Sequence, residues 1–311
     1  MSAMLITRLK FRRRREDVII RSRIPAMFLA AAIPFLAASC FRTTDPLVIG
    51  IVPSESPEVL RDEFRGMENY LETAMERNID VYVPDDYREL IEAMRNGDVD
   101  IGLYGPFSFI VAESRQDLVP LLVRKKKTSG ITYNSLIVAR SDSDIAAVED
   151  LEDRTMAFVN TASTSGFVIP QSLFISRGID IDSFLERHYF AGSHDLVVAD
   201  VLAGRCDAGA VSKTILERLV EKGDVNAGDL KILWESDPIP GSPYVARGDL
   251  DSRTIETFTA VMEIVHERDP SALEAFDASI EKYVPVEDGL YDPIRNIVNI
   301  LGWDFIERNY L

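Results

Sequence analysis

The run Leu47-Val48-Ile49-Gly50-Ile51-Val52 decides the fold class of this chain. It is uninterrupted in apolar residues, rich in β-branched side chains and too short for a helix, a pattern typical of a strand buried on both faces of a parallel sheet. Strand and helix patterns then alternate, with helices expected at 58–76, 87–96 and 107–114 and strands at 80–83, 100–104 and 118–123. This order predicts an α/β protein with a parallel sheet and right-handed crossovers.

The alternation restarts after a loop at 124–132, in which Lys125-Lys126-Lys127 reads as a solvated turn. Pro238, Pro240 and Pro243 later indicate a stiff crossing segment, because prolines at this density exclude both helix and central strand. We therefore expect two α/β lobes, with the C-terminal part of the chain returning to the first. The expected division is 45–132 for the first part of lobe 1, 133–242 for lobe 2, and 243–311 for the return to lobe 1 and the C-terminal helices.

Residues 1–44 have the layout of an export signal. An arginine-rich stretch precedes an apolar run at 24–39, which is short for a membrane span and ends in small residues before Cys40. Cys40 resembles the lipidated cysteine of a bacterial lipobox, although Ala37 stands where such boxes carry Leu, Val or Ile. Lipidation of Cys40, simple cleavage and an uncleaved anchor all stay open. Each predicts a periplasmic or extracytoplasmic protein, and we expect it to be attached to the membrane through its N-terminus.

Charge is distributed unevenly along the 311 residues. Residues 1–44 hold nine of the 34 Lys and Arg and two of the 51 Asp and Glu, so the remainder has 25 bases, 49 acids and a formal charge of −24. Such a body is not expected to bind nucleic acid by bulk electrostatics. If it binds an anion, the attraction must be local, from backbone N–H groups, hydroxyls and a histidine.

The segment Ser163-Thr164-Ser165-Gly166 follows a strand expected at 155–159 and begins a helix. Hydroxyls at a helix N-terminus combine side-chain donors, free backbone N–H groups and the positive end of the helix dipole, which together favour a tetrahedral oxyanion. A simple helix cap at Ser163 or Thr164 is the alternative. His194 lies at the next strand-to-helix turn of the same sheet. Ligands collect at the carboxyl ends of parallel strands, so both turns should face one crevice.

Tyr87 and Tyr104 occupy corresponding turns of the first sheet, from which each phenol could reach a ligand oxygen across the cleft. Ordinary packing of either tyrosine is the alternative. A histidine in the position of His194 would be favoured as a cation by a bound anion.

Taken in order, several motifs resemble those of the phosphate, phosphite and phosphonate-binding proteins of ABC importers. The resemblance spans residues 47 to about 245 and rests on Gly50-Ile51-Val52-Pro53-Ser54-Glu55-Ser56, Asp100-Ile101-Gly102-Leu103-Tyr104, Ser163-Thr164-Ser165-Gly166-Phe167, Gly192-Ser193-His194-Asp195 and Trp234-Glu235-Ser236-Asp237-Pro238. It implies a type II periplasmic-binding fold that captures a small phosphorus oxyanion by hinge closure. The two lobes would be joined by a two-segment hinge near Thr132–Asn134 and Pro240–Pro243, with the ligand in the cleft between the lobes. Ser163, Thr164, Ser165 and His194 would hold the ligand from one lobe, and Tyr87 and Tyr104 would close from the other.

Two departures from the family pattern bear on the ligand. Thr214 and Ser242 stand where relatives that bind aminoalkylphosphonates place carboxylates, which favours phosphite, phosphate or an alkylphosphonate without an amine. Leu103 replaces a Trp that often precedes the tyrosine at the end of the third strand, so the side-chain pocket should differ in shape.

Three other classes of function are alternatives to this reading. An enzyme is disfavoured because the sequence has no Gly-x-Ser-x-Gly elbow, Walker loop or His-Glu-x-x-His motif, and with three histidines in all we expect neither a metal nor a cofactor. A sensing module of the same fold and a binder of sulfonates or other organic anions remain open. The expected partners are the oxyanion and a membrane permease, with the chain itself a monomer.

Overall fold

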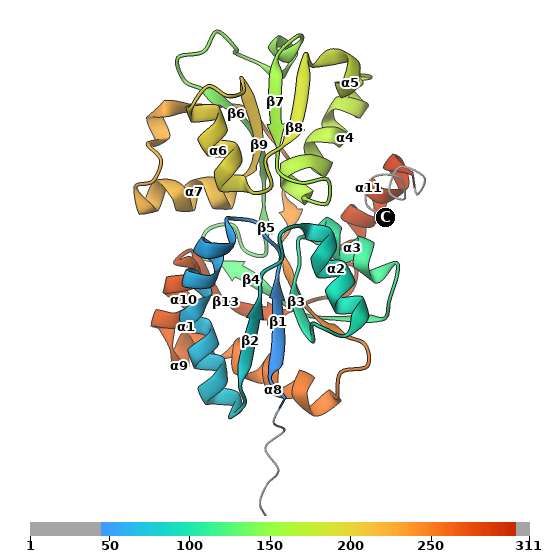
Figure 1. The fold of residues 1–311 in the computed structure, drawn as a ribbon, viewed down its shortest axis with the longest axis vertical. Coiled ribbons are helices and arrows are strands. Elements are labelled where there is room, and N and C mark those ends of the chain that lie inside the picture. The colour runs from blue at the N-terminus through green and yellow to red at the C-terminus, as the bar shows by residue number, and fades with distance from the viewer. Residues whose placement is uncertain (1–44, 303–311) are drawn as a thin grey trace, which may run out of the picture. The chain divides into compact units, whose positions relative to one another are not determined.

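The structure, a computed structural model, describes residues 45–302. The predicted export segment, Cys40 included, and the residues after 302 lie outside that range. The described residues form two mixed β-sheets of six and five strands, with helices around both and a two-stranded ribbon between them (Figure 1). In this part of the chain, none of the helices combines the length and the apolar character that crossing a membrane requires.

The first sheet has the strand order β13-β4-β12-β3-β1-β2. β1 pairs in parallel with β2 and β3, as the apolar run predicts, and its Leu47 and Ile49 side chains are fully buried. β12 runs antiparallel between β3 and β4, so the sheet is mixed rather than parallel throughout. The chain leaves the first sheet at the carboxyl end of β4 and returns to it at that same end through β12. β12 must therefore run in the direction opposite to β4. The strands are β1 (Leu47–Ile51), β2 (Ile79–Tyr82), β3 (Ile101–Leu103), β4 (Leu118–Lys126), β12 (Pro243–Arg247) and β13 (Ile280–Pro285).

The helices around the first sheet follow local sequence signals. The predicted helix at 87–96 is α2 (Tyr87–Asn96), in which the Asp86 carboxylate accepts hydrogen bonds from the N–H groups of Arg88 and Glu89 and Gly97 ends the helix at a positive φ of 82°. α1 buries residues at helical spacing, among them Leu60, Phe64 and Leu71. The other helices of this part are α3 (Pro106–Glu113), α8 (Ser252–Glu263), α9 (Val265–Arg268), α10 (Pro270–Asp277) and α11 (Asp292–Leu301), with α1 spanning Pro57–Met75.

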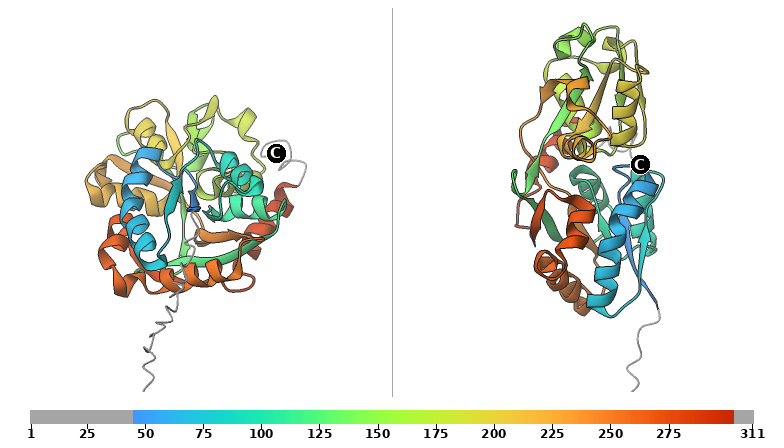
Figure 2. Two further views of the ribbon diagram at one scale, coloured as in Figure 1. Left: turned by 60° about the horizontal axis from the view of Figure 1, so that its bottom comes forward. Right: turned by 90° about the vertical axis from the view of Figure 1, so that its left-hand side faces the viewer.

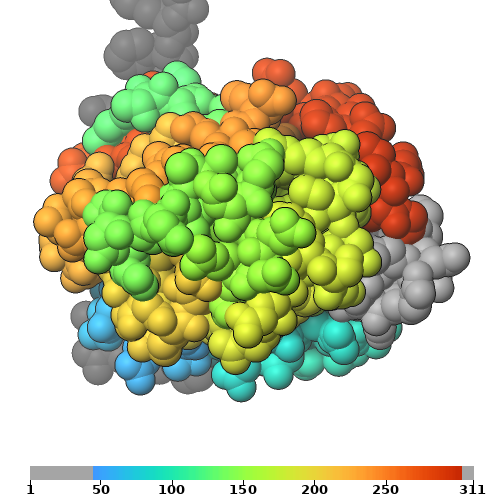
Figure 3. Space-filling view, turned by 90° about the horizontal axis from the view of Figure 1, so that it is seen from above, coloured from blue at the N-terminus to red at the C-terminus, as the bar shows by residue number. Residues whose placement is uncertain are grey.

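The second sheet has the order β10-β6-β9-β7-β8. β7 pairs in parallel with β8 and β9, whereas β6 runs antiparallel to β9 and β10. Its strands are β6 (Ser135–Arg140), β7 (Thr155–Phe158), β8 (Arg187–Phe190), β9 (Ala208–Ser212) and β10 (Leu230–Glu235). The helical segments are η1 (Val148–Leu151), the π-helical turn η2 (Thr164–Val168), α4 (Ile169–Ser176), α5 (Ile181–Phe184), α6 (His194–Leu202), α7 (Lys213–Lys222) and η3 (Ala227–Asp229). Figure 3 looks onto this end of the molecule, where the green-to-orange middle of the chain forms most of the visible surface.

Two short strands cross between the sheets. β5 (Thr132–Tyr133) and β11 (Ile239–Pro240) pair antiparallel with each other and with no other described strand (Figures 1 and 2). A proline is tolerated here because a two-stranded ribbon leaves one side of each strand unpaired. β5 lies within one of the two expected hinge segments, and β11 overlaps the other at Pro240.

The prediction of a solvated turn at Lys125-Lys126-Lys127 is confirmed only for Lys127, which lies in an exposed turn. β4 continues to Lys126 and pairs with β13, so Arg124 and Lys126 lie on one face of a strand. The Lys126 ammonium donates to Asp277 at 3.1 Å and to Ser279 at 2.8 Å, and only 11% of its side chain is exposed. The buried carboxylate of Asp277, 151 residues away in the sequence, gives this lysine a partner that local sequence could not reveal.

Candidate functional site

The carboxyl ends of the parallel strands in the second sheet gather the predicted anion ligands. β7 and β8 are direct neighbours, so the turns that follow them lie at the same edge of the sheet. The turn after β7 carries Ser163, Thr164 and Ser165, and the turn after β8 leads into His194 at the start of α6. All four side chains are buried and line one cavity.

This cavity has a volume of about 70 Å³. At 10–15 Å³ per water, it has room for roughly five water-sized groups. Tyr87 and Gly105 line it from the first sheet, and Thr132 and Tyr133 line it from the crossing ribbon. The space suits a tetrahedral oxyanion with a short tail.

The hydroxyl groups of Ser163, Thr164 and Ser165 are linked to both halves of the cavity wall. Ser163 Oγ accepts a hydrogen bond from Gly166 N at 3.1 Å, and Thr164 Oγ1 accepts one from Phe107 N at 2.8 Å. Ser163 is thus a helix cap as well as a cavity residue, because a hydroxyl that accepts one bond can still donate another. A Cβ at Gly166 would lie 2.3 Å from Val159, so this turn requires glycine.

Tyrosine hydroxyls meet these groups from the other side. Tyr87 forms a hydrogen bond with Ser163, and burial raises its pKa above the ordinary range despite that bond. Tyr133 forms hydrogen bonds with Ser165 and Thr164, and burial raises its pKa to about 12. Both phenols therefore stay protonated and can donate to an anion. The sequence analysis missed Tyr133, although it lies inside the predicted hinge segment.

Tyr104 does not belong to this group. Its side chain is fully buried, its hydroxyl donates to the carbonyl of Leu90 on α2 at 3.2 Å, and it does not line the cavity. Its ring packs over Gly102, where a Cβ would lie 2.4 Å from the tyrosine ring. The missing side chain at Gly102 gives Tyr104 a place inside the first half of the molecule. The expected contact between Tyr104 and the ligand is corrected accordingly.

His194 is held as a neutral donor. Its Nδ1 accepts the N–H of Ser212 at 3.0 Å, so the ring proton sits on Nε2. Burial lowers the pKa of His194 to about 4, and the nearby Asp195 only partly opposes this. The expectation of a cationic histidine therefore does not fit this environment; the side chain offers one neutral N–H.

This buried histidine predicts a specific dependence of stability on pH. The pKa is about 4 in the folded protein and about 6.5 when unfolded, so the unfolded chain binds the proton more readily between these values. The free energy of unfolding should fall by roughly 2 kcal/mol between pH 7.5 and pH 5 from this group alone. Urea titrations should show that His194→Gln removes this part of the dependence and that His266→Gln, a change at a half-buried histidine of α9, retains it. Equal pH dependence in the wild type and both variants would contradict the assignment.

Three cations that the sequence analysis did not assign to the site also line the cavity: Arg124, Lys126 and Arg218. Arg124 and Lys126 come from alternate positions of β4, and Arg218 lies on α7 one helical turn after Thr214. Two-residue spacing in the strand and four-residue spacing in the helix are the signals that could have identified them. No residue that lines this cavity is Asp or Glu; Thr214, Ser242 and Leu103, the departures from the family pattern, all line it.

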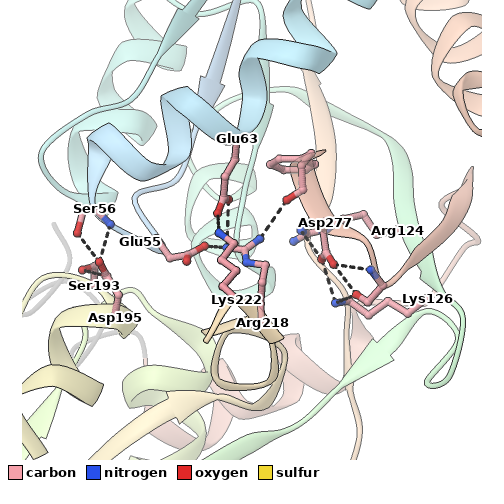
Figure 4. A network of polar contacts seen from close by, with 12 residues as sticks. Glu55, Ser56, Glu63, Arg124, Lys126, Ser193, Asp195, Arg218, Lys222 and Asp277 are labelled. Atoms are coloured by element: carbon pink, nitrogen blue, oxygen red, sulfur yellow. Dashed lines mark hydrogen bonds and ion pairs between the residues drawn. The ribbon is translucent and has the colours of Figure 1, made fainter. Parts of the chain in front are cut away.

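Charged contacts join the elements of the two sheets next to this cavity (Figure 4). Arg218 on α7 pairs with Glu55, which is fully buried before α1, and lies 3.4 Å from Glu63 on α1. Glu63 also pairs with Lys222 on α7, and Asp195 on α6 accepts from Ser56. The backbone N–H of His194 donates to Ser54 O at 3.0 Å. The structure therefore holds the two halves closed around the cavity.

Among residues 45–302, no cluster of three or more His, Cys, Asp and Glu side chains is placed to hold a metal ion. Cys206 is buried, and burial raises the pKa of its thiol to about 11, so this side chain packs as a small apolar group.

Comparison with known proteins gives consistent matches. The family model "ABC transporter, phosphonate, periplasmic substrate-binding protein" matches residues 49–291. The phosphate-import protein PhnD of Mycolicibacterium smegmatis is 27% identical over 314 residues, covering 91% of this chain and 98% of that protein. The probable ABC transporter phosphite binding protein PhnD1 of Prochlorococcus marinus is 25% identical over 273 residues, covering 83% and 90%.

A solved structure of PhnD1 from Prochlorococcus marinus in complex with methylphosphonate superposes with a TM-score of 0.73 at 21% identity, covering 82% of this chain and 97% of that chain. This likeness confirms the predicted fold class, two α/β lobes of the type II periplasmic-binding kind.

Proposed function

The chain belongs to the periplasmic substrate-binding proteins of phosphonate ABC transporters, and we propose that it captures a small phosphorus oxyanion whose tail carries no amine. It is a binding protein rather than an enzyme. The observation that carries the proposal is a single cavity lined by three hydroxyl residues, by His194 with its proton on Nε2, and by two protonated tyrosines.

The donors fit the chemistry of a phosphorus oxyanion. Hydrogen bonds from neutral donors to an anionic oxygen are stronger than those between neutral groups, and a buried site increases the difference. Ser163, Thr164, Ser165 and His194 would bind the oxyanion from the second sheet, and Tyr87 and Tyr133 would donate from the first sheet and the ribbon. Phosphite, phosphate and a short alkylphosphonate all fit the volume of the cavity.

The cavity walls disfavour an amine. An ammonium tail would need a carboxylate partner when buried, and no acid lines the cavity. Thr214 and Ser242 offer only hydroxyl groups, and the charged side chains of the wall are cations. Ligands such as 2-aminoethylphosphonate should therefore bind more weakly than methylphosphonate.

We further propose that the protein works by closing. Bending at the ribbon of β5 and β11 would open the cavity, and the ligand would then draw the two halves together. The closed complex would deliver the oxyanion to a membrane permease as a monomer. Attachment to the outer face of the membrane through Cys40 would keep the protein near that permease.

Calorimetric titration tests this proposal. The protein should bind at least one of phosphite, phosphate and methylphosphonate in the micromolar range or tighter, and 2-aminoethylphosphonate at least tenfold more weakly than methylphosphonate. Sulfate serves as a control tetrahedral anion without phosphorus. Heat from sulfate or a sulfonate alone, with none from the phosphorus compounds, would overturn the assignment.

A further inference from the structure

The ion pairs beside the cavity contain more cations than carboxylates. Three buried carboxylates, Glu55, Glu63 and Asp277, lie within ion-pair distance of four cations. Arg218 and Lys222 pair with the two glutamates, and Lys126 pairs with Asp277. The fourth cation is Arg124. Arg124 therefore shares the carboxylate of Asp277 with Lys126, which lies closer to it.

The contacts of Arg124 are weak in comparison. Its Nη1 atom lies 3.9 Å from Asp277 Oδ2, beyond hydrogen-bond distance, and its guanidinium stands over the ring of Phe276 at 5.8 Å. Lys126 lies between hydrogen-bond partners at 3.1 and 2.8 Å, by contrast. Only 18% of the Arg124 side chain is exposed, and the residue lines the cavity. A buried guanidinium has donors in a planar fork that fits a carboxylate. Figure 4 shows Arg124 beside Asp277 and Lys126, apart from the Arg218 group.

We infer that Arg124 forms a second anion subsite in this cavity, which takes a carboxylate on the short tail of the phosphorus ligand. The hydroxyl groups of Ser163, Thr164 and Ser165 would hold the phosphorus oxyanion, and Arg124, which lines the same cavity, would bind the carboxylate. Ser242 and Thr214, which line the cavity together with Arg124, can donate further hydrogen bonds. The inference rests on the proposed function and narrows its ligand class to phosphonocarboxylates.

Three ligands of similar length separate the charge of the tail from its size. Phosphonoacetate ends in a carboxylate, phosphonoacetamide is its neutral isostere, and 2-aminoethylphosphonate carries an ammonium. The protein should bind phosphonoacetate at least tenfold more tightly than phosphonoacetamide and bind the amine most weakly. Calorimetry measures the ratio of the two dissociation constants directly.

Arg124→Gln tests the residue. Asp277 keeps Lys126 and Ser279 as partners in this variant, so no buried carboxylate is left alone. The ratio between phosphonoacetamide and phosphonoacetate should fall from at least ten to about one. Arg154→Gln removes one positive charge at an exposed ion pair with Asp144, outside the cavity, and should leave the ratio as it is in the wild type. Each ratio compares the dissociation constants of two ligands on the same protein. A partial loss of folded protein affects both measurements equally and therefore does not change the ratio.

Two results would overturn the subsite. Equal binding of phosphonoacetate and its amide by the wild type would remove the carboxylate preference while leaving the proposed function in place, provided that methylphosphonate binds. A loss of affinity in Arg124→Gln by the same factor for both ligands would assign Arg124 to the phosphorus group instead. Failure of every phosphorus ligand to bind the wild type would overturn the proposed function itself.

Discussion

Replacing Arg218 by methionine is expected to weaken ligand binding by a factor of 100 or more. The change leaves the fully buried Glu55 carboxylate without its partner, and breaking a buried ion pair from one side costs about 3–5 kcal/mol. The pair joins α7 to the segment before α1, so the Glu55 carboxylate is buried without a partner only when the two halves are closed. When they open, water can reach the carboxylate, and the free-energy cost is removed. A ligand that binds by closing the two halves then loses the same free energy.

The double variant Arg218→Met with Glu55→Gln distinguishes this effect from a direct contact between Arg218 and the ligand. A neutral amide is much less costly to bury than a carboxylate, so the double variant should regain most of the lost affinity. Calorimetry with methylphosphonate measures both the loss of affinity in Arg218→Met and its recovery in the double variant. Small-angle scattering should show a larger radius of gyration in the single variant than in the wild type. If the double variant binds as weakly as Arg218→Met, the loss must come from the ligand contact and not from Glu55.

Ser163→Ala and His194→Ala are each expected to weaken binding of the oxyanion by about 10- to 100-fold while leaving the fold intact. Each removes one donor to an anionic oxygen, and a hydrogen bond to a charged group contributes roughly 1.5–3 kcal/mol. Ser163→Ala also removes the cap on Gly166 N, which should cost about 1 kcal/mol of stability. Titration by calorimetry and thermal unfolding separate the two effects.

Ser176→Ala is the matched control for Ser163. Its hydroxyl bonds to a helix carbonyl at the exposed end of α4, away from the cavity, so ligand affinity should not change. Unchanged affinity in both Ser163→Ala and His194→Ala would contradict the placement of the oxyanion at these groups.

Much of the fold could be predicted because its signals are local. The apolar run of β1, the alternation of strands and helices, and the boundaries of α2 from Asp86 to Gly97 depend on residues close in sequence. The placement of Ser163 and His194 at one sheet edge followed from a general property of parallel strands.

Contacts between distant segments account for the errors. The insertion of β12 between β3 and β4 depends on where the chain returns after β11, which no local pattern encodes. Tyr104 turned inward because Gly102 and α2 provide space for its ring. The protonation of His194 depends on Ser212 N, 18 residues away, and on the burial of the side chain in the folded protein.

The sequence by itself thus determined an α/β body with hydroxyl groups and a histidine at one strand edge, because backbone periodicity and strand direction are local or general properties. Tertiary structure alone decided the charges of the cavity. Arg124 and Lys126 lie in a lysine-rich run that reads as a surface turn, and Glu55, Glu63, Arg218 and Asp277 are far apart in the chain. An ion's protonation, partners and accessibility depend on what folding packs around it, so only the folded structure shows which cations line the cavity and which carboxylates they share.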